Sequence, residues 1–359
     1  MDSITQAAVG GAIGEACFGR TIGNKAVLLG VLVGSLPDFD VLRHPFISDV
    51  ARLHWHRGVS HSLITACAAG VGFYLLALYR KNKAEQQKLE PIKGASPLRW
   101  GGFGFLAIAS HTLIDCFTIY GTKIFSPFSD YRVGLGNLFL IDPFYTVPLL
   151  LGLGGAILAG RLQPRKRAFR NWTGIIVSSL YVLLSLSFQA LAQDRMQSSL
   201  ARQGVSWEDW LTVPTPFNIL LWRGVAKSES GYWIGYRSVL TGLFRDDPPL
   251  SRFCYVPRNE ELIGRLAGAQ EVASLKWFSD GWYIVRPHQD GIRFSDIRSG
   301  ERVIETLVPE FFVSWILSDQ DGSLVVREQD ILLDGYPGTI RQLWDSIVGR
   351  HDPAICQSE

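Results

Sequence analysis

Apolar residues form long runs, not alternating patterns, over the first 192 positions, which is typical of helices buried in lipid or against one another. Residues 172–192 carry no charge and are long enough to cross the apolar core of a bilayer, which takes about 20 residues. Similar but shorter runs occupy residues 60–79, 100–114 and 143–160. These runs predict a bundle of membrane helices.

The first 36 residues carry two more apolar stretches, 4–18 and 26–36, each too short to cross a membrane comfortably. The first is rich in glycine and alanine, with Glu15 as its polar exception. Small residues allow helices to approach closely. We therefore expect a helical hairpin packed inside the bundle.

Beyond residue 192 the pattern changes to short aromatic and β-branched segments. We expect an interfacial helix over 194–211 and then strands over 232–240, 282–285, 292–297 and 311–317. Asp280-Gly281, Asp290-Gly291 and Asp321-Gly322 are hairpin-turn signals. The predicted fold is an α-helical integral membrane bundle, residues 1–192, followed by a smaller β-rich (α+β) soluble C-terminal domain, residues 193–359.

Charge predicts the orientation of the bundle. Residues 80–99 and 161–170 are rich in lysine and arginine, and such segments stay cytoplasmic. The C-terminal domain would then lie on the non-cytoplasmic side. The formal net charge is +2 without a basic stripe, so no nucleic-acid partner is expected. The N-terminus lacks the basic segment of a cleaved signal peptide.

The five cysteines contain no CxxC pair, which argues against a thiolate zinc site. Cys17 and Cys67 lie in apolar runs and read as small core residues. Cys254 and Cys356 would be able to form a disulfide in an exported domain.

Ionisable residues cluster where the helix of 60–79 begins. The segment from His54 to Ser62 holds three of the seven histidines, and such groups at the mouth of a membrane helix are costly and usually functional. The candidate metal ligands are two acids upstream, two histidines here and a helical i, i+4 pair downstream. They are Asp38, Asp40, His56, His61, His111 and Asp115. By the predicted topology all six collect on the non-cytoplasmic face.

These six groups would suit one divalent ion or two close ones, and two ions would suit hydrolysis of a phosphoester. Asp38 and His61 are the candidate catalytic groups, with Arg57 as a fork for a phosphate or carboxylate. Each piece also has a purely structural interpretation: a helical His–Asp hydrogen bond, an aspartate cap, or interfacial histidines. No GxSxG elbow surrounds Ser60 or Ser62, so a serine hydrolase is not expected.

Several ordered motifs resemble the bacterial inner-membrane proteins called YdjM-like, described as membrane-bound metal-dependent hydrolases. The matching stretches are MDSIT (1–5), LPDFD (36–40), HRGVSHS (56–62), SHTLIDCFTIYGT (110–122), IDPFYT (141–146) and PTPFNILLWRG (214–224). The resemblance implies an inner-membrane helical fold distantly similar to zinc-dependent phospholipase C and P1-type nucleases. It also implies that the six candidate ligands match metal-binding positions.

Two positions depart from the family pattern. Gln6 stands where the family often has histidine, and an amide is a poor zinc ligand; Ser60 replaces a threonine. The resulting hypothesis is a membrane hydrolase using zinc, or else manganese, whose metal-activated water attacks a phosphoester, with membrane lipids as partners. The substrate, small or lipid, and the oligomeric state stay open. The alternative is a non-catalytic membrane binding or assembly protein whose polar cluster is structural.

Overall fold

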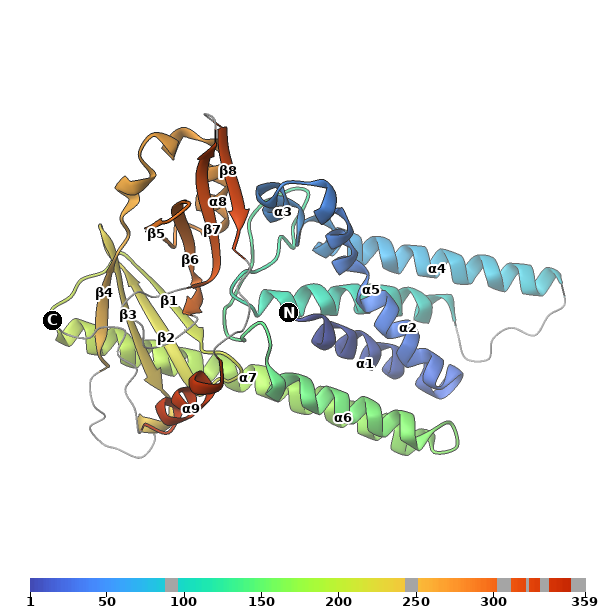
Figure 1. Cartoon of the computed structure of the whole chain (residues 1–359). Coiled ribbons are helices and arrows are strands. Elements are labelled where there is room, and N and C mark those ends of the chain that lie inside the picture. Colours follow the sequence, from blue (N-terminus) through green and yellow to red (C-terminus); the bar gives the residue numbers. More distant parts are fainter. Residues whose placement is uncertain (88–95, 243–250, 302–310, 321–322, 330–335, 350–359) are drawn as a thin grey trace. The chain divides into compact units, whose positions relative to one another are not determined.

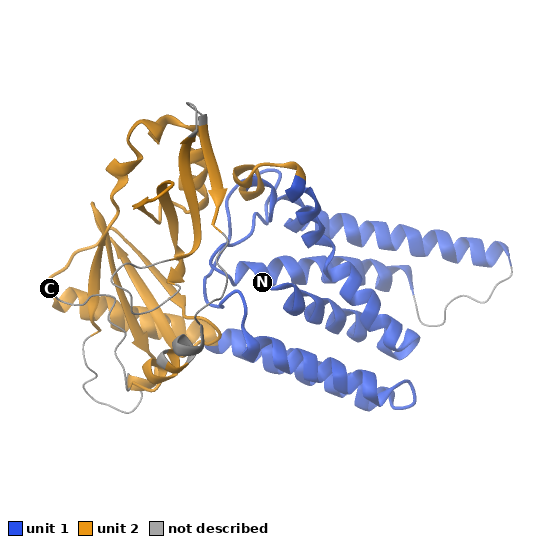
Figure 2. Ribbon diagram, viewed as in Figure 1, with its two compact units in different colours: residues 1–45, 54–184 blue, residues 46–53, 185–359 orange. Residues whose placement is uncertain are grey.

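The computed structural model describes residues 1–87, 96–242, 251–301, 311–320, 323–329 and 336–349 (Figure 1). The chain divides into two compact units (Figure 2). The first unit holds residues 1–45 and 54–184, and the second holds residues 46–53 and 185–359. The boundary at 184 falls inside one long helix, α7 (Pro164–Arg202).

The first unit is helical. Besides the first part of α7 it contains α1 (Ser3–Ile22), α2 (Asn24–Gly34), α4 (Leu63–Gln86), α5 (Pro97–Cys116) and α6 (Pro143–Ala159). Its polar segments include the 3₁₀ helices η1 (Leu36–Phe46) and η2 (Val59–His61). The predicted helices are all present, and α4 and α5 are longer than the apolar runs from which they were predicted.

The predicted N-terminal hairpin is α1 packed against α2. Asp2 caps α1 by accepting hydrogen bonds from the Ile4 and Thr5 amides. Glycines then bring the two helices together: a Cβ atom on Gly14 would lie 2.1 Å from the Ala26 carbonyl oxygen, and one on Gly30 2.1 Å from that of Gly10. Only glycine permits this spacing, because the obstructing atoms belong to the backbone.

Glu15 and Arg167 form a buried ion pair between α1 and α7. The Arg167 Nε donates to Glu15 Oε1 at 2.6 Å, its Nη2 donates to Oε2, and its Nη1 donates to Asn24 Oδ1 at 2.6 Å. The basic segment 161–170 was predicted as a loop, but α7 already begins at Pro164, and Arg167 within it is paired with Glu15. The acid that balances it lies far away in the sequence.

Two of the described helices are long and apolar enough to cross a membrane, α4 and α7, and α2 and α6 are shorter apolar helices. Only 6% of the most apolar 18-residue window of α4 and 22% of that of α7 is buried within the protein. A core helix of a water-soluble protein would be mostly covered, so these apolar faces suit contact with lipid.

The second unit is built on two antiparallel four-stranded sheets, as the β-rich prediction requires. The first sheet runs in sequence order through β1 (Asp209–Pro214), β2 (Leu221–Lys227), β3 (Gly231–Ser238) and β4 (Phe253–Pro257). The second runs through β5 (Tyr283–His288), β6 (Gly291–Glu301), β7 (Phe311–Gln320) and β8 (Ser323–Glu328). Helices α3 (Asp49–Trp55), α8 (Gln270–Phe278) and α9 (Tyr336–Ile347) and the 3₁₀ helices η3 (Leu240–Gly242) and η4 (Glu260–Gly268) complete the described elements.

Alternating strand residues make two cores. Ile284 packs with Val225, Tyr232 and Ile234 of the first sheet, and its neighbour Val285 packs on the other face with α8 and η4 residues such as Leu275. A strand buried on both faces gives this alternation because successive side chains point oppositely.

The four predicted strands correspond to β3, β5, β6 and β7, whereas β1, β2, β4 and β8 were missed. The interfacial helix over 194–211 is wrong: α7 continues to Arg202 and β1 begins at Asp209. The β5–β6 hairpin turn lies at Gln289-Asp290, and Gly291 is the first residue of β6, whereas Asp280-Gly281 joins α8 to β5. Asp321-Gly322 lies outside the described residues.

The cysteines differ between the two units. Cys254 of β4 is disulfide-bonded, whereas Cys17, Cys67 and Cys116 are free. Cys67 is exposed on α4, contrary to the expectation of a core residue. Cys356 lies outside the described residues.

Candidate metal centre

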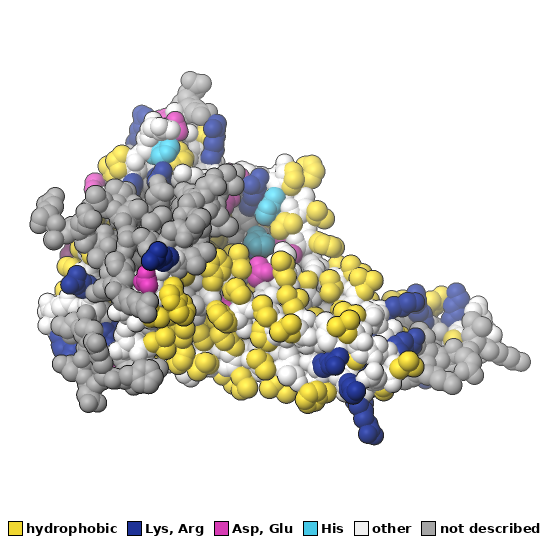
Figure 3. Space-filling model, turned by 60° about the horizontal axis from the view of Figure 1, so that its bottom comes forward, with side chains coloured by type: hydrophobic (Ala, Val, Ile, Leu, Met, Phe, Trp, Pro, Cys, Tyr) yellow, Lys and Arg dark blue, Asp and Glu magenta, His cyan; other side chains and the backbone are white. Residues whose placement is uncertain are grey.

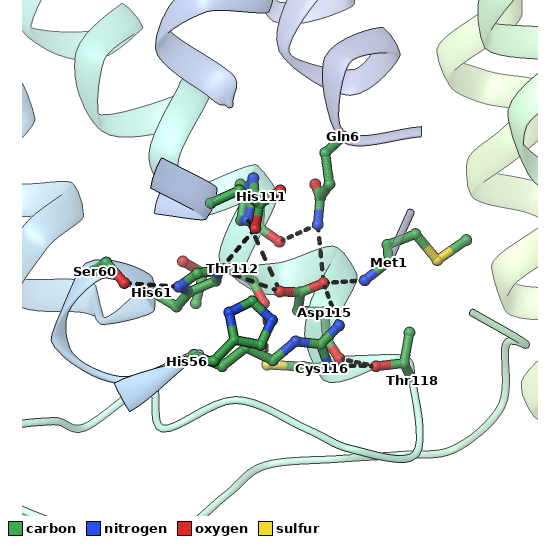
Figure 4. A network of polar contacts seen from close by, with 12 residues as sticks. Met1, Gln6, His56, Ser60, His61, His111, Thr112, Asp115, Cys116 and Thr118 are labelled. Carbon is green, nitrogen blue, oxygen red and sulfur yellow. Dashed lines mark hydrogen bonds and ion pairs between the residues drawn. The ribbon is translucent and has the colours of Figure 1, made fainter. Parts of the chain in front are cut away.

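Three segments of the helical unit bring the predicted ligands together. Figure 4 shows four of these ligands: His56, His61, His111 and Asp115. The 3₁₀ helix η1 begins with Leu36 and Pro37 and carries Asp38 and Asp40. His56 precedes η2, and His61 ends it. His111 and Asp115 lie one turn apart on α5 and therefore share a face.

Asp38, His61 and His111 form the centre of the cluster. Their ligand atoms all lie within 4.8 Å of one another. Asp38 Oδ1 is 3.2 Å from His61 Nε2 and 3.4 Å from His111 Nε2. Asp115 approaches the same two nitrogens, with Oδ2 at 3.6 Å from His61 Nε2 and 3.9 Å from His111 Nε2.

The two separations from Asp38 are close to those of a tetrahedral coordination set. Ligand atoms about 2.0–2.1 Å from a tetrahedral zinc lie about 3.3–3.4 Å apart. Asp38, His61 and His111 therefore fit a divalent ion with nitrogen and oxygen ligands, and Asp115 lies beside them at longer distances.

Hydrogen bonds on the far side of each ring fix which nitrogen faces the cluster. His111 Nδ1 lies 2.7 Å from the Gly34 carbonyl oxygen, which only accepts, so Nδ1 carries the proton. The Nε2 atom of the neutral ring then presents a lone pair, and it is buried without a hydrogen-bond partner. An orphaned acceptor that faces a carboxylate oxygen is the arrangement that a cation would satisfy.

His61 is oriented by a relay. The Ser60 hydroxyl donates to Asp40 Oδ2 at 3.1 Å and lies 2.9 Å from His61 Nδ1. Because its single proton goes to Asp40, Ser60 accepts from His61 Nδ1–H. His61 Nε2 then faces Asp38 Oδ1 at 3.2 Å, and this is the ring nitrogen that would bind a metal.

Asp40 and His56 lie farther out. Asp40 also accepts from the Arg57 backbone N–H at 3.3 Å, and Oδ1 is 3.1 Å from His56 Nδ1. In this arrangement Asp40 supports His61 through Ser60, and His56 stands beside Asp40 with its side chain 37% exposed. Both were predicted as ligands, and the compact trio does not include them.

Arg57 faces inward in a left-handed backbone conformation, with φ of 57°. Its Nη1 donates to the Thr118 hydroxyl at 3.1 Å and the Gly121 carbonyl oxygen at 3.3 Å, and its Nη2 lies 3.4 Å from Asp115 Oδ1. The Arg57 guanidinium therefore contacts protein groups here, and one of them is the Asp115 carboxylate beside the centre.

Residues of the N-terminus occupy the other oxygen of Asp115. The Met1 amino group donates to Oδ1, and Gln6 Nε2 donates to it at 2.9 Å. The Gln6 Oε1 atom is buried and unpartnered. Position 6 had a sequence signal, because Gln6 departs from the family motif. No sequence signal indicated the contacts of Met1, Thr118 or Gly34.

The electrostatic environment keeps the ligands in the forms that bind cations. Burial raises the pKa of Asp38, but the neighbouring His111 and His61 imidazoles outweigh burial and hold the pKa well below its ordinary value. Asp40 shifts in the same direction, because His56 and His61 outweigh its burial. Burial lowers the pKa of His61, and nearby His111 adds to this effect against the raising influence of Asp38 and Asp115.

Burial is uneven around the cluster. His61, His111 and Asp115 are at most 1% exposed, whereas the Asp38 side chain is 26% exposed. Access from outside is therefore on the Asp38 side. Asp142, also on the predicted face, instead caps α6 and accepts from the Tyr181 hydroxyl at 3.0 Å.

Comparison with known proteins gives one match. The family model described as YdjM inner membrane protein matches residues 1–195, which is more than half of the 359-residue chain. No curated protein and no solved structure matches the chain.

Proposed function

Because the chain belongs to the YdjM inner membrane protein family, we propose that it is a membrane-bound, metal-dependent hydrolase whose centre is built on Asp38, His61 and His111. The observation that carries this proposal is the convergence of two imidazole lone pairs on one carboxylate oxygen, with the His111 Nε2 atom left without a partner. Zinc suits two imidazoles with carboxylates, and manganese is the second choice.

The protein's own groups have separable roles in this proposal. Gly34 and Ser60 hold the two rings, and Asp40 accepts the Ser60 proton. Arg57 offsets the charge of Asp115 from the other side. Bound there, a divalent ion would lower the pKa of a coordinated water and supply a nucleophile near neutral pH. Asp38, on the exposed side of the centre, is the group placed to orient that water.

A phosphoester of a lipid is the substrate class we propose. The 3₁₀ helix that carries Asp38 and Asp40 exposes apolar side chains beside them, with Phe39 54% and Leu42 68% exposed. An acyl chain would cover such residues, and a phosphoester would present its oxygens to the cation.

We also propose that the centre and the C-terminal domain face away from the cytoplasm. In Figure 3, a broad hydrophobic surface separates Lys and Arg side chains at one end of the helical unit from His and acidic side chains. Basic ends remain cytoplasmic. The disulfide-bonded Cys254 fits an oxidising compartment.

Metal content tests the proposal most directly. Detergent-purified wild type should contain a stoichiometric divalent ion, and His61→Ala should lose most of it. His288→Ala, on β5 of the other unit, should retain the ion. Hydrolysis of a chromogenic phosphodiester should follow the metal content.

One result would favour the alternative. If wild type and His61→Ala bind equally little zinc and manganese between about pH 5 and pH 8, the metal proposal fails. The polar cluster would then serve a structural role in a non-catalytic membrane binding or assembly protein.

A further inference from the structure

The chain leaves the helical unit between the two motifs that carry the metal centre. Residues 46–53 belong to the second unit, although residues 1–45 and 54–184 belong to the first (Figure 2). This excursion begins six residues after Asp40 and ends three residues before His56. Its position in the sequence makes it the only covalent link between the two ligand-bearing motifs.

The base of the excursion is closed by two contacts in the helical unit. Asp40 Oδ1 lies 3.1 Å from His56 Nδ1. One step farther along, the Arg43 guanidinium carbon lies 4.1 Å from the centre of the Trp55 ring, a cation–π contact. Residues 46–53 are therefore the tip of a closed loop, and the two ligand-bearing motifs lie at its base. A displacement of the tip would be transmitted to both motifs.

The tip of the excursion is held by the C-terminal sheet. Asp49 Oδ2 accepts a hydrogen bond at 3.0 Å from the backbone N–H of Glu328, on β8. That strand is the last in the order of its sheet, so Asp49 accepts from a backbone donor of an edge strand. Arg52 Nη1 lies 2.9 Å from Asp49 Oδ1 and fixes the carboxylate.

Leu53 adds an apolar anchor to this polar one. It packs against the core cluster that contains Val285, Phe294, Trp315 and Leu317. The polar contact of Asp49 and the apolar contact of Leu53 dock residues 46–53 on the C-terminal domain. Neither side chain belongs to the metal centre.

We infer that the C-terminal domain is a clamp on the metal centre, with Asp49 and Leu53 as positioning residues that set the spacing between the Asp38–Asp40 and His56–His61 motifs. Without the clamp, each motif gains conformational freedom that metal binding must remove, so affinity falls. Anything that binds the C-terminal domain near β8 would then modulate the centre. The inference rests on the proposed metal site.

The test uses full-length protein and two readouts. Hydrogen exchange of residues 36–45 and 54–62 in metal-free protein reports the spacing directly. Cobalt affinity and the visible d–d bands of the bound ion report its consequence at the centre. The variants are Leu53→Ala and Asp49→Ala. Their matched controls are Leu266→Ala, in η4 against the same core cluster, and Glu261→Ala, an exposed acid on η4.

We expect Leu53→Ala and Asp49→Ala to speed exchange in both ligand-bearing segments. They should also weaken cobalt binding about tenfold or more, the range in which supporting residues tune metal sites. Leu266→Ala should lower the melting temperature of the C-terminal domain but leave both readouts at wild-type values. If Leu53→Ala does not fold, Asp49→Ala carries the test.

The inference is overturned if the two clamp variants behave as their controls do in both readouts. Wild type that binds no cobalt would instead refute the proposed function. In that case hydrogen exchange alone tests whether the C-terminal domain sets the spacing of the two motifs. Faster exchange in the clamp variants would support this, and unchanged exchange would refute it.

Discussion

The two carboxylate oxygens of Asp115 face different groups. Oδ2 faces His61 and His111, at 3.6 and 3.9 Å, whereas Oδ1 receives hydrogen bonds from the Met1 amino group and Gln6 and lies near Arg57. A second cation at Oδ1 would meet the Arg57 guanidinium and two groups that already donate hydrogen bonds to this oxygen. We therefore expect one ion per chain, although the ligand set alone allowed one or two.

Replacing Gln6 with histidine tests this division. The Gln6 amide donates to Asp115 and offers a zinc ion only a weak carbonyl ligand, whereas a neutral imidazole is a strong ligand. We expect Gln6→His to tighten zinc binding about tenfold, the scale on which surrounding groups tune affinity. Zinc titration would measure this. Gln6→Ala should show no gain, and a loss in Gln6→His would mean that position 6 does not face the ion.

The depressed pKa of His61 predicts how metal binding responds to acid. An unperturbed histidine begins to protonate near pH 6.5, but burial lowers the pKa of His61, and Asp38 ionises well below its ordinary range. His61 and Asp38 therefore become protonated, and lose the ability to bind the ion, only at lower pH. We expect zinc affinity to change little from about pH 7.5 to 6.5 and to fall below that. Calorimetric titration that finds affinity already halved above pH 6.5 would contradict this.

At the scale of elements, the α1–α2 hairpin reaches the centre through one carbonyl. The last residue of α2, Gly34, accepts from His111 Nδ1, and the same residue packs against Gly10 of α1. The spacing of two helices therefore sets the orientation of a ligand on a third, α5.

Gly30→Ala should disturb this spacing. Its Cβ atom would lie 2.1 Å from the Gly10 carbonyl oxygen and 2.9 Å from the Gly14 Cα, and backbone cannot yield as a side chain can. We expect a loss of about 1–3 kcal/mol in the free energy of unfolding, together with weaker metal binding. Thermal unfolding in detergent and zinc titration measure the two effects.

Gly102→Ala is the matched control for that substitution. Gly102 is an exposed position in α5 where a Cβ atom meets nothing within 4 Å. Alanine there should stabilise the helix by about 0.5–1 kcal/mol and leave metal binding unchanged. Equal effects of the two substitutions would argue against close α1–α2 packing as the reason for the glycines.

At the scale of the whole molecule, orientation follows from where the positive charges lie. Apart from Arg167, which pairs with Glu15, the basic residues at the end of α4 and around Arg161 and Arg165 mark one end of the helical unit. We expect a cysteine placed at Glu229, an exposed position between β2 and β3, to react with a membrane-impermeant maleimide in intact cells. A cysteine at Lys81 should react only after permeabilisation.

This labelling would use a chain in which the free cysteines Cys17, Cys67 and Cys116 are replaced. Reaction at Lys81→Cys and protection at Glu229→Cys would reverse the proposed orientation, and with it the side on which the centre lies.

The C-terminal unit includes the end of α7, which predicts where it can be separated. Met196 and Leu200 are fully buried, and Ser199 Oγ donates to the Ser251 carbonyl oxygen at 3.2 Å. In oxidising conditions, residues 185–359 should fold with a sheet-type circular dichroism spectrum and melt cooperatively. A fragment of 206–359, which lacks these contacts, should melt at a lower temperature. Equal melting would show that α7 adds nothing to this unit.

The sequence by itself determined the elements whose patterns are local. Helices were predicted from apolar runs, four strands from short aromatic and β-branched segments, and the His111–Asp115 pair from its i, i+4 spacing. The motif order also identified Asp38, His61 and His111 as partners. These features depend on residues close in sequence or on chemistry that few residue types provide.

Only the tertiary structure decided which groups those residues meet. The partners of His111, Arg167 and Asp115 are Gly34, Glu15 and Gln6, and none of these pairings leaves a periodic trace in the chain. The same holds for residues 46–53, whose eight side chains look like an ordinary connection in the sequence. Such contacts depend on the packing of distant segments, because a hydrogen bond or an apolar contact is fixed by distance in space, which local sequence does not encode.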